Sequence, residues 1–158
     1  MIHEHRKFEY ILDLLDQVVT KLGSIHAPRH DFRTGIPLYR SEIHTVQAVG
    51  HQPGINITQL AEHLGVTKGA VSQMINKLVK KGLVYKTRIG TDSREIVLNL
   101  TELGLIGFHA HEQFHLEMYK IIREYFGDEF DSKVDLFIAV MTDLNGILDK
   151  FERRSDKA

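Results

Sequence analysis

Apolar positions between residues 56 and 82 repeat at helical spacing in two short runs. The first run consists of Ile57, Leu60, Ala61 and Leu64. Its i, i+3, i+4, i+7 spacing predicts a short helix with one apolar face. Gly65 follows at the position where helices often end in a left-handed residue. We therefore expect the first helix to stop there and the chain to turn.

The second run predicts a helix that begins after Thr67, a residue type that caps helix N-termini. Its apolar positions are Ala70, Val71, Met74, Ile75, Leu78 and Val79. Gly82 ends it. Two helices joined by a turn that contains glycine are typical of a helix-turn-helix, whose second helix enters a major groove of DNA.

After Gly82 the period changes from helical to alternating. The runs Leu83–Thr87 and Glu95–Leu100 read as strands, and residues 89–93 read as the turn between them. This is a β-hairpin, or wing. The predicted fold class is mainly α with a small β-hairpin wing, a winged helix-turn-helix flanked by N- and C-terminal helices that form a dimerisation region.

Positive charge is concentrated in this region. Residues 63–91 contain no Asp or Glu, although the whole chain has a formal net charge of only -1. The basic residues of the segment are Lys68, Lys77, Lys80, Lys81, Lys86 and Arg88. A nearly neutral protein with one basic segment presents a surface suited to a polyanion, which favours double-stranded DNA as the partner.

The exposed positions of the second helix supply candidate contacts. Gln73 and Asn76 have amide groups that can read a base edge, Ser72 suits a base or a phosphate, and the lysines suit phosphates. Arg94 lies past the wing tip, where it could enter a minor groove, and Asp92 would orient it. The predicted DNA-binding residues are Thr67, Lys68, Ser72, Gln73, Asn76, Lys77, Arg88 and Arg94.

The flanking segments carry apolar stripes. A first helix has Phe8, Ile11, Leu12, Leu15, Val18, Val19 and Leu22 and should end near Gly23. The last helix has Phe130, Val134, Phe137, Met141, Leu144, Leu148 and Phe151 at alternating spacings of four and three. Such a heptad seam packs either on its own domain or on a second chain.

These segments together resemble the MarR family of dimeric bacterial and archaeal regulators. The resemblance is carried by HQPGINITQLAEHLGVTKGAVSQMINKLVKKGLV, by Asp92-Ser93-Arg94 and by LNLTELG, and it extends over roughly residues 8–152. It implies a single domain with a DNA-binding lobe at about 36–100 and dimerisation helices at about 5–27 and 102–152. It also implies a homodimer that binds a pseudo-palindromic operator and acts as a ligand-responsive transcriptional regulator, most simply a repressor.

Composition excludes several other classes. The chain has no cysteine, which excludes disulfides and a thiol-oxidation switch. No apolar run is long enough to span a bilayer, and the first residues lack a secretory apolar region. We expect a cytoplasmic protein without a membrane partner. A nucleoid-type DNA binder without a signal is a third possibility, distinguished by weak sequence preference.

Ten histidines form the second informative pattern. His111 and His115 are spaced i, i+4 on a helix expected at about residues 102–126, which suits two imidazoles on one metal ion. With Glu112, the string HEQFH also matches the zinc metallopeptidase motif, in which Glu112 would be the general base. A peptidase also needs a third ligand and a substrate cleft. Because this helix belongs to the dimerisation region of a regulator, we expect no enzyme.

The histidines also resemble the metal site of the zinc-responsive repressors within this family. That resemblance implies the ligands His44, His111 and His115, with His26 or His30 as the fourth. It implies zinc or another divalent transition metal that modulates operator binding. Phe32, Ile43 and Ala110 occupy the positions of that branch's second metal site, which we therefore expect to be absent. The alternatives are an exposed histidine pair, or a pocket, lined in part by His44, for a phenolic or aromatic carboxylate.

Overall fold

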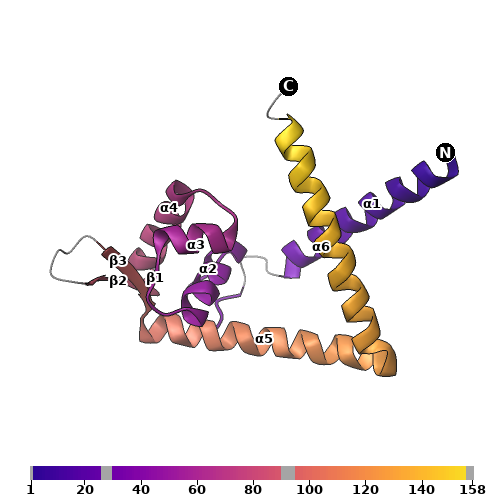
Figure 1. The fold of residues 1–158 in the computed structure, drawn as a ribbon. Helices are drawn as coiled ribbons and strands as arrows, with labels where there is room; N and C mark the ends of the chain where they lie inside the picture. Colours follow the sequence, from indigo (N-terminus) through magenta and orange to yellow (C-terminus); the bar gives the residue numbers. More distant parts are fainter. Residues whose placement is uncertain (1, 26–29, 90–94, 156–158) are drawn as a thin grey trace. The chain divides into compact units, whose positions relative to one another are not determined.

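The computed structural model describes residues 2–25, 30–89 and 95–155. Its helices are α1 (Ile2–Ile25), α2 (Arg40–His51), α3 (Ile57–Leu64), α4 (Lys68–Lys80), α5 (Glu102–Phe126) and α6 (Phe130–Ser155), with a 3-10 turn η1 (Gly127–Glu129) before α6. Its strands are β1 (Ile55–Asn56), β2 (Val84–Ile89) and β3 (Glu95–Leu100). The expected fold class, mainly helical with a small sheet, is confirmed (Figure 1). The chain divides into two compact units, residues 1–113 and 114–158.

Local sequence signals set the ends of the helix-turn-helix. At the start of α3, the Asn56 side chain accepts a hydrogen bond from Gln59 N at 2.9 Å, while Gln59 Oε1 accepts one from Asn56 N at 3.0 Å. Gly65 ends α3 in the left-handed region, with φ 65°. Thr67 Oγ1 then caps α4 by accepting a hydrogen bond from the backbone N–H three residues on at 3.2 Å. The predicted boundaries between the two helices are therefore confirmed.

The sheet has one strand more than the hairpin that the sequence predicts. Its order is β1-β3-β2 with both pairs antiparallel, and Ile55 of β1 pairs with Leu98 of β3. Strand β1 has only two residues, too few for an alternating pattern to show. Strand β2 continues to Ile89, which was expected in the turn; the rest of that turn lies outside the described residues.

The core of the first unit lies among α2, α3, α4 and the sheet. Its fully buried apolar side chains are Leu38, Ile43, Val46, Val49, Ile55, Leu60, Val71, Ile75, Leu78, Leu83 and Leu98. The buried face of α4 is narrower than its apolar pattern suggests. Ala70 is exposed and Val79 is 39% exposed, so these two apolar side chains are not part of the core.

The apolar stripes of α1 and α6 are exposed within one chain. Phe8 on α1 is 53% exposed and Phe137 on α6 is 62% exposed. In the second unit, Phe130 at the start of α6 packs edge-on against Tyr119 of α5, with ring centroids 5.5 Å apart. None of the described helices combines the length and the apolarity needed to cross a membrane.

We predict that Gly104→Ala destabilises the protein. An alanine in a helix is usually favoured over glycine by roughly 0.5–1 kcal/mol. A Cβ on Gly104, however, would overlap the Leu83 carbonyl oxygen and lie 3.2 Å from Leu100 Cβ. Because backbone must move to relieve this overlap, we expect a net loss of about 1–3 kcal/mol in the free energy of unfolding. Denaturant titration would measure the loss.

Gly69→Ala is the matched control. Gly69 is also helical, and a Cβ there would meet only Thr67 Oγ1, at 3.9 Å. We expect this variant to be neutral or slightly more stable. Equal midpoints for the two variants would contradict the close approach of α5 to the backbone of Leu83, just before β2.

Candidate nucleic-acid interface and histidine cluster

Helix α4 presents the predicted reading residues along one face. Gln73, Asn76 and Lys77 are exposed, and Ser72 is half-buried. Lys68 is exposed at the first position of the helix. Amide and hydroxyl groups thus occupy the middle of the exposed face, with lysines near both ends. This arrangement suits contact with base edges at the centre and with phosphates on either side.

The other predicted DNA contacts have different surroundings. The Thr67 hydroxyl oxygen is used in capping α4, so this residue fixes the start of the helix whatever else it contacts. Arg88 is exposed on β2. Arg94 and Asp92 lie outside the described residues, so their predicted roles in the wing stay predictions.

A contact that the sequence did not suggest joins the wing to the recognition helix. Lys86 Nζ on β2 donates a hydrogen bond to Asn76 Oδ1 on α4 at 2.8 Å. Both side chains are exposed. The basic pattern alone assigned Lys86 to the general positive charge of the segment, with no specific partner.

An ion pair connects the start of α2 to the residue that follows α4. Glu42 in the first turn of α2 lies 2.6 Å from Lys81 Nζ, just after α4, and the two side chains are 4% and 26% exposed. Glu42 also accepts a hydrogen bond from the Tyr39 backbone N–H at 2.9 Å. Lys81 Nζ donates a second hydrogen bond, to the Pro37 carbonyl oxygen at 3.0 Å. The Lys81 ammonium group therefore has two partners within the protein, Glu42 and the Pro37 carbonyl oxygen.

The structure brings His44 and His111 together. His111 on α5 is fully buried, and its ring centroid lies 5.2 Å from that of His44 on α2. Phe32 packs edge-on against His111 with centroids 5.2 Å apart. The alternative of an exposed histidine pair is therefore wrong for His111. Burial was not visible from the sequence, because it depends on Phe32 and His44, which are distant in the chain.

His115 completes a cluster with His111 on one turn of α5. The nitrogen and carboxylate atoms of His111, Glu112 and His115 that could bind a metal all lie within 4.8 Å of one another. This closeness is a local property of the helix. Of the expected ligands, His44 lies against His111, and His115 lies one turn further along α5 from His111.

His26 and His30 were the two alternatives expected for a fourth ligand. His30 packs against Phe32 with ring centroids 5.8 Å apart, and Phe32 in turn contacts His111. His26, the other candidate, lies outside the described residues. A second metal site was expected to be absent because apolar residues occupy its positions. Two of them, Phe32 and Ile43, are buried.

Glu112 bridges α5 to α2. Its Oε1 accepts a hydrogen bond from Gln47 Nε2 at 2.8 Å and lies 3.3 Å from His51 Nε2. The carboxylate is therefore directed toward α2 side chains. The sequence offered no sign of this link, because Gln47 and Glu112 are 65 positions apart.

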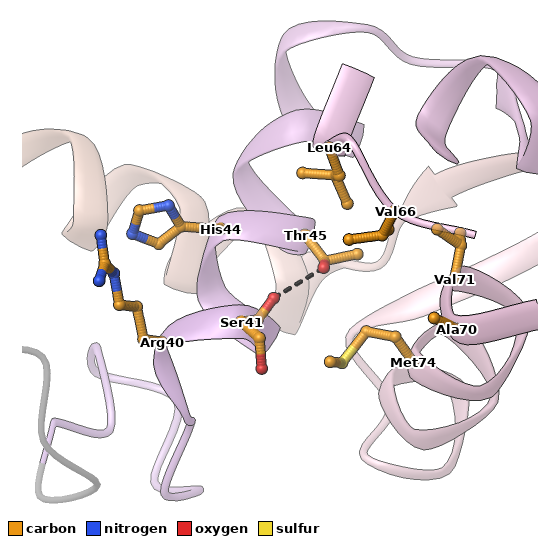
Figure 2. Close-up of a pocket in the computed structure, with 9 residues that line it drawn as sticks. All are labelled: Arg40, Ser41, His44, Thr45, Leu64, Val66, Ala70, Val71 and Met74. Atoms are coloured by element: carbon orange, nitrogen blue, oxygen red, sulfur yellow. Dashed lines mark hydrogen bonds between the residues drawn. The ribbon is translucent and has the colours of Figure 1, made fainter. Parts of the chain in front are cut away.

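A pocket of about 330 Å³ lies behind the recognition helix. Its lining residues are Arg40, Ser41, His44, Thr45, Leu64, Val66, Ala70, Val71 and Met74. Figure 2 shows the α2 residues Arg40, Ser41, His44 and Thr45 on one side, and the apolar side chains of α3, the α3–α4 turn and α4 on the other. Ala70 and Met74, part of the apolar pattern of α4, thus line a pocket.

The comparisons with known proteins agree with this geometry. Residues 38–96 match the model of the MarR family. Over these residues the chain resembles the winged helix-turn-helix of the MarR family. Among curated relatives, the transcriptional regulator YhjH of Bacillus subtilis is 27% identical over 87% of this chain and 75% of its own length. The transcriptional regulator ZitR of Lactococcus lactis is 23% identical over 82% of this chain and 94% of its own length.

Solved MarR-type structures share the fold. Streptococcus pneumoniae FabT, solved in complex with DNA, superposes with a TM-score of 0.72 at 24% identity, covering 93% of this chain and 98% of that one. The adhesin competence repressor AdcR of Streptococcus pyogenes gives a TM-score of 0.63 at 25% identity, and the match covers 83% of this chain and 94% of the AdcR chain. The fold is shared with transcriptional regulators, and the family matched by residues 38–96 consists of regulators, which are not enzymes. The peptidase reading of HEQFH is thereby set aside.

We predict that Lys81→Met destabilises this MarR-type lobe. The methionine keeps most of the apolar stem but leaves the nearly buried Glu42 carboxylate without its cation. An unsatisfied buried charged group costs at least about 1–3 kcal/mol. Urea unfolding should show a lower midpoint with an unchanged m-value.

Lys80→Met provides the comparison, because Lys80 is exposed and forms no ion pair within the described part of the chain. Its unfolding midpoint should stay close to that of the parent protein. Equal losses in the two variants would show that Lys81 does not stabilise the fold through Glu42.

Proposed function

We propose that this protein is a sequence-specific transcriptional repressor that acts as a homodimer on a pseudo-palindromic operator. A divalent metal ion, most simply zinc, controls its operator binding. The DNA-binding lobe is residues 36–100, and the dimerisation helices are residues 5–27 and 102–152. The observation that supports the metal proposal is the buried His111 imidazole, which has His44 at 5.2 Å between ring centroids and His115 one turn further along α5.

The reading face supports sequence-specific binding. Gln73, Asn76 and Ser72 carry hydrogen-bonding groups on the exposed side of α4. Lys68, Lys77 and Arg88 are exposed on the same lobe and supply charge for phosphates. Arg94 of the wing is proposed for a minor groove, with Asp92 orienting it. A binder without sequence preference would not need amide groups at the centre of its recognition helix.

The exposed apolar stripes support a dimer. A single chain leaves Phe8, Val18, Phe137, Leu148 and Phe151 between 49% and 69% exposed. Contiguous exposed apolar surface on terminal helices is typical of an interface. A second copy of the chain would cover it and place two recognition helices about 34 Å apart, as successive major grooves require.

The histidine geometry fits a metal of the zinc type. Zinc binds imidazole nitrogens at about 2.0–2.1 Å, so two imidazoles on one tetrahedral ion have ring centres roughly 5 Å apart. The His44 and His111 rings are 5.2 Å apart, and His115 lies one turn from His111. A set of imidazoles also suits nickel, copper or cobalt. The fourth ligand would come from His26 or His30.

This placement suggests how metal would control DNA binding. A metal on His44, His111 and His115 would hold α2 against α5. The Glu42–Lys81 pair then holds α2 to the end of α4, so the ion would restrain the recognition helix. Glu112, held by Gln47 and facing His51, adds a second α2–α5 link. Coupling of this kind is typically about 1–3 kcal/mol, which changes operator affinity several-fold or more.

The pocket behind α4 favours a second candidate effector. It combines an apolar wall with Arg40 and His44 at one edge, a surface suited to a phenolic or aromatic carboxylate. Its volume, about 330 Å³, is within the range of small-ligand sites. Because His44 belongs to both the pocket and the metal cluster, the two effectors would not act independently.

We predict that Gln73→Ala and Lys77→Ala weaken DNA binding in different ways. Gln73→Ala should relax base preference at one position per half-site, because it removes an amide from the reading face. Lys77→Ala should weaken all sequences about equally and reduce the salt slope by roughly 0.9. Binding to the selected operator and to scrambled duplexes at several salt concentrations would separate the two effects. If neither variant changed operator binding, the docking of α4 would be wrong.

We predict that His111→Ala abolishes tight binding of one divalent ion per protomer. His111 is the buried member of the cluster, whereas His109 is exposed on a different face of α5, so His109→Ala should bind metal normally. Metal must compete with protons for neutral imidazoles, so affinity should fall as pH drops through about 6.5. Zinc calorimetry would measure both.

The same titration with operator DNA tests the regulatory step. Metal should raise operator affinity, and operator should raise metal affinity by the same factor. Equal, weak zinc uptake by parent and His111→Ala proteins would rule out the metal site and leave an organic acid in the pocket as the effector.

A further inference from the structure

The hydrogen bond between Lys86 and Asn76 orients a side chain that the recognition helix α4 would present to a base. The inference drawn from it rests on the DNA-binding function proposed above. Asn76 is on the exposed face of α4, and Lys86 reaches it from the neighbouring strand β2, with the ammonium nitrogen 2.8 Å from Asn76 Oδ1. No other hydrogen bond of the Asn76 side chain is present in the described residues.

An ammonium group determines how the amide is turned. Lysine has three N–H donors and no acceptor, so only the oxygen of the asparagine amide can face it. The Oδ1 atom is therefore held toward the wing, and Nδ2 with its two N–H donors is directed away from Lys86. An asparagine without such a neighbour can present either group.

This orientation changes the base that Asn76 can recognise. Reading adenine through two hydrogen bonds requires the amide oxygen to accept from adenine N6 while the amide nitrogen donates to N7. Lys86 takes one of the two lone pairs of Oδ1 and turns this oxygen toward the wing, away from an adenine N6 group, so that Asn76 presents its Nδ2 donors to the base. Guanine presents two acceptors, N7 and O6, on its major-groove edge. The Asn76 amide and the remaining Lys86 donors form an all-donor pair that matches those two acceptors.

We propose that Lys86 is a specificity-determining residue that makes Asn76 select guanine over adenine in each half-site. Gln73, one turn earlier on the same face, has no such hydrogen bond in the described part of the chain, so its amide keeps both a donor and an acceptor. The positive charge of Lys86 also polarises the Asn76 amide and strengthens its donors.

The test is operator selection from a randomised duplex by the parent protein and by two variants. Asn76→Ala identifies the base pair that Asn76 reads, as the position where preference is lost. Lys86→Met keeps the apolar stem and removes the ammonium, so the amide is released to turn. We expect the parent protein to prefer guanine at that position, and Lys86→Met to shift the ratio toward adenine by roughly tenfold or more.

Arg88→Met is the matched control on the same strand. Arg88 is exposed, two residues from Lys86, and has no hydrogen bond to α4 in the described residues. It should weaken all sequences about equally and leave the guanine preference intact. Circular dichroism should show unchanged helix content in every variant, since all three side chains are exposed.

Several outcomes would overturn the proposal. These are adenine selected by the parent protein, no lost preference in Asn76→Ala, or a uniform loss of affinity in Lys86→Met with the base ratio unchanged. The last result would make Lys86 a phosphate contact only. A parent protein that selects no sequence at all would instead refute the proposed function, which keeps the two failures distinguishable.

Discussion

The ion pair between Glu42 and Lys81 is the contact that ties the recognition helix α4 to α2. It joins the first turn of α2 to the residue that follows α4, at 2.6 Å and with Glu42 only 4% exposed. A carboxylate this buried is costly unless its charge is compensated, so the pair fixes the distance between the two helices. The Tyr39 N–H and the Pro37 carbonyl oxygen satisfy further hydrogen-bonding capacity of the two side chains. The recognition helix is therefore held to α2 rather than only to the sheet.

In the proposed mechanism, α2 is the helix through which a metal ion or an organic acid would act on the recognition helix. Glu42 is at its start, His44 faces the cluster and the pocket, and Gln47 reaches Glu112 of α5. A twelve-residue helix is about 18 Å long and moves as one body, so a restraint on any one of these side chains is felt by the others. A metal ion and an organic acid would use different chemistry at His44, yet both would bias the same helix. This shared element explains how one fold can accommodate either kind of effector.

The fold could be predicted where local chemistry decides it. Asn56, Gly65 and Thr67 set the helix boundaries through hydrogen bonds and a positive φ that depend on neighbouring residues. The strand β1 could not be predicted, because two residues carry no period and pair only after the chain has folded. The same limit holds for the site. The spacing of His111 and His115 indicates one helix face, but the burial of His111 depends on Phe32 and His44, which are distant in sequence. The link from Gln47 to Glu112 has no local sequence signal at all.

Charge composition alone overstates the surface available to DNA. Six basic residues lie between positions 63 and 91, a segment without acidic residues. Lys81, however, binds the carboxylate of Glu42, and Lys86 is held on the amide of Asn76. The four remaining cations, Lys68, Lys77, Lys80 and Arg88, form no ion pair within the described residues and are exposed. Because each phosphate contact contributes about 0.9 to the salt slope, the described part of each lobe should release counterions for about four contacts rather than six. The other two cations have internal partners: Lys81 holds α4 to α2 through Glu42, and Lys86 orients the Asn76 amide, so their contribution is to position groups on the DNA-binding lobe rather than to add phosphate contacts.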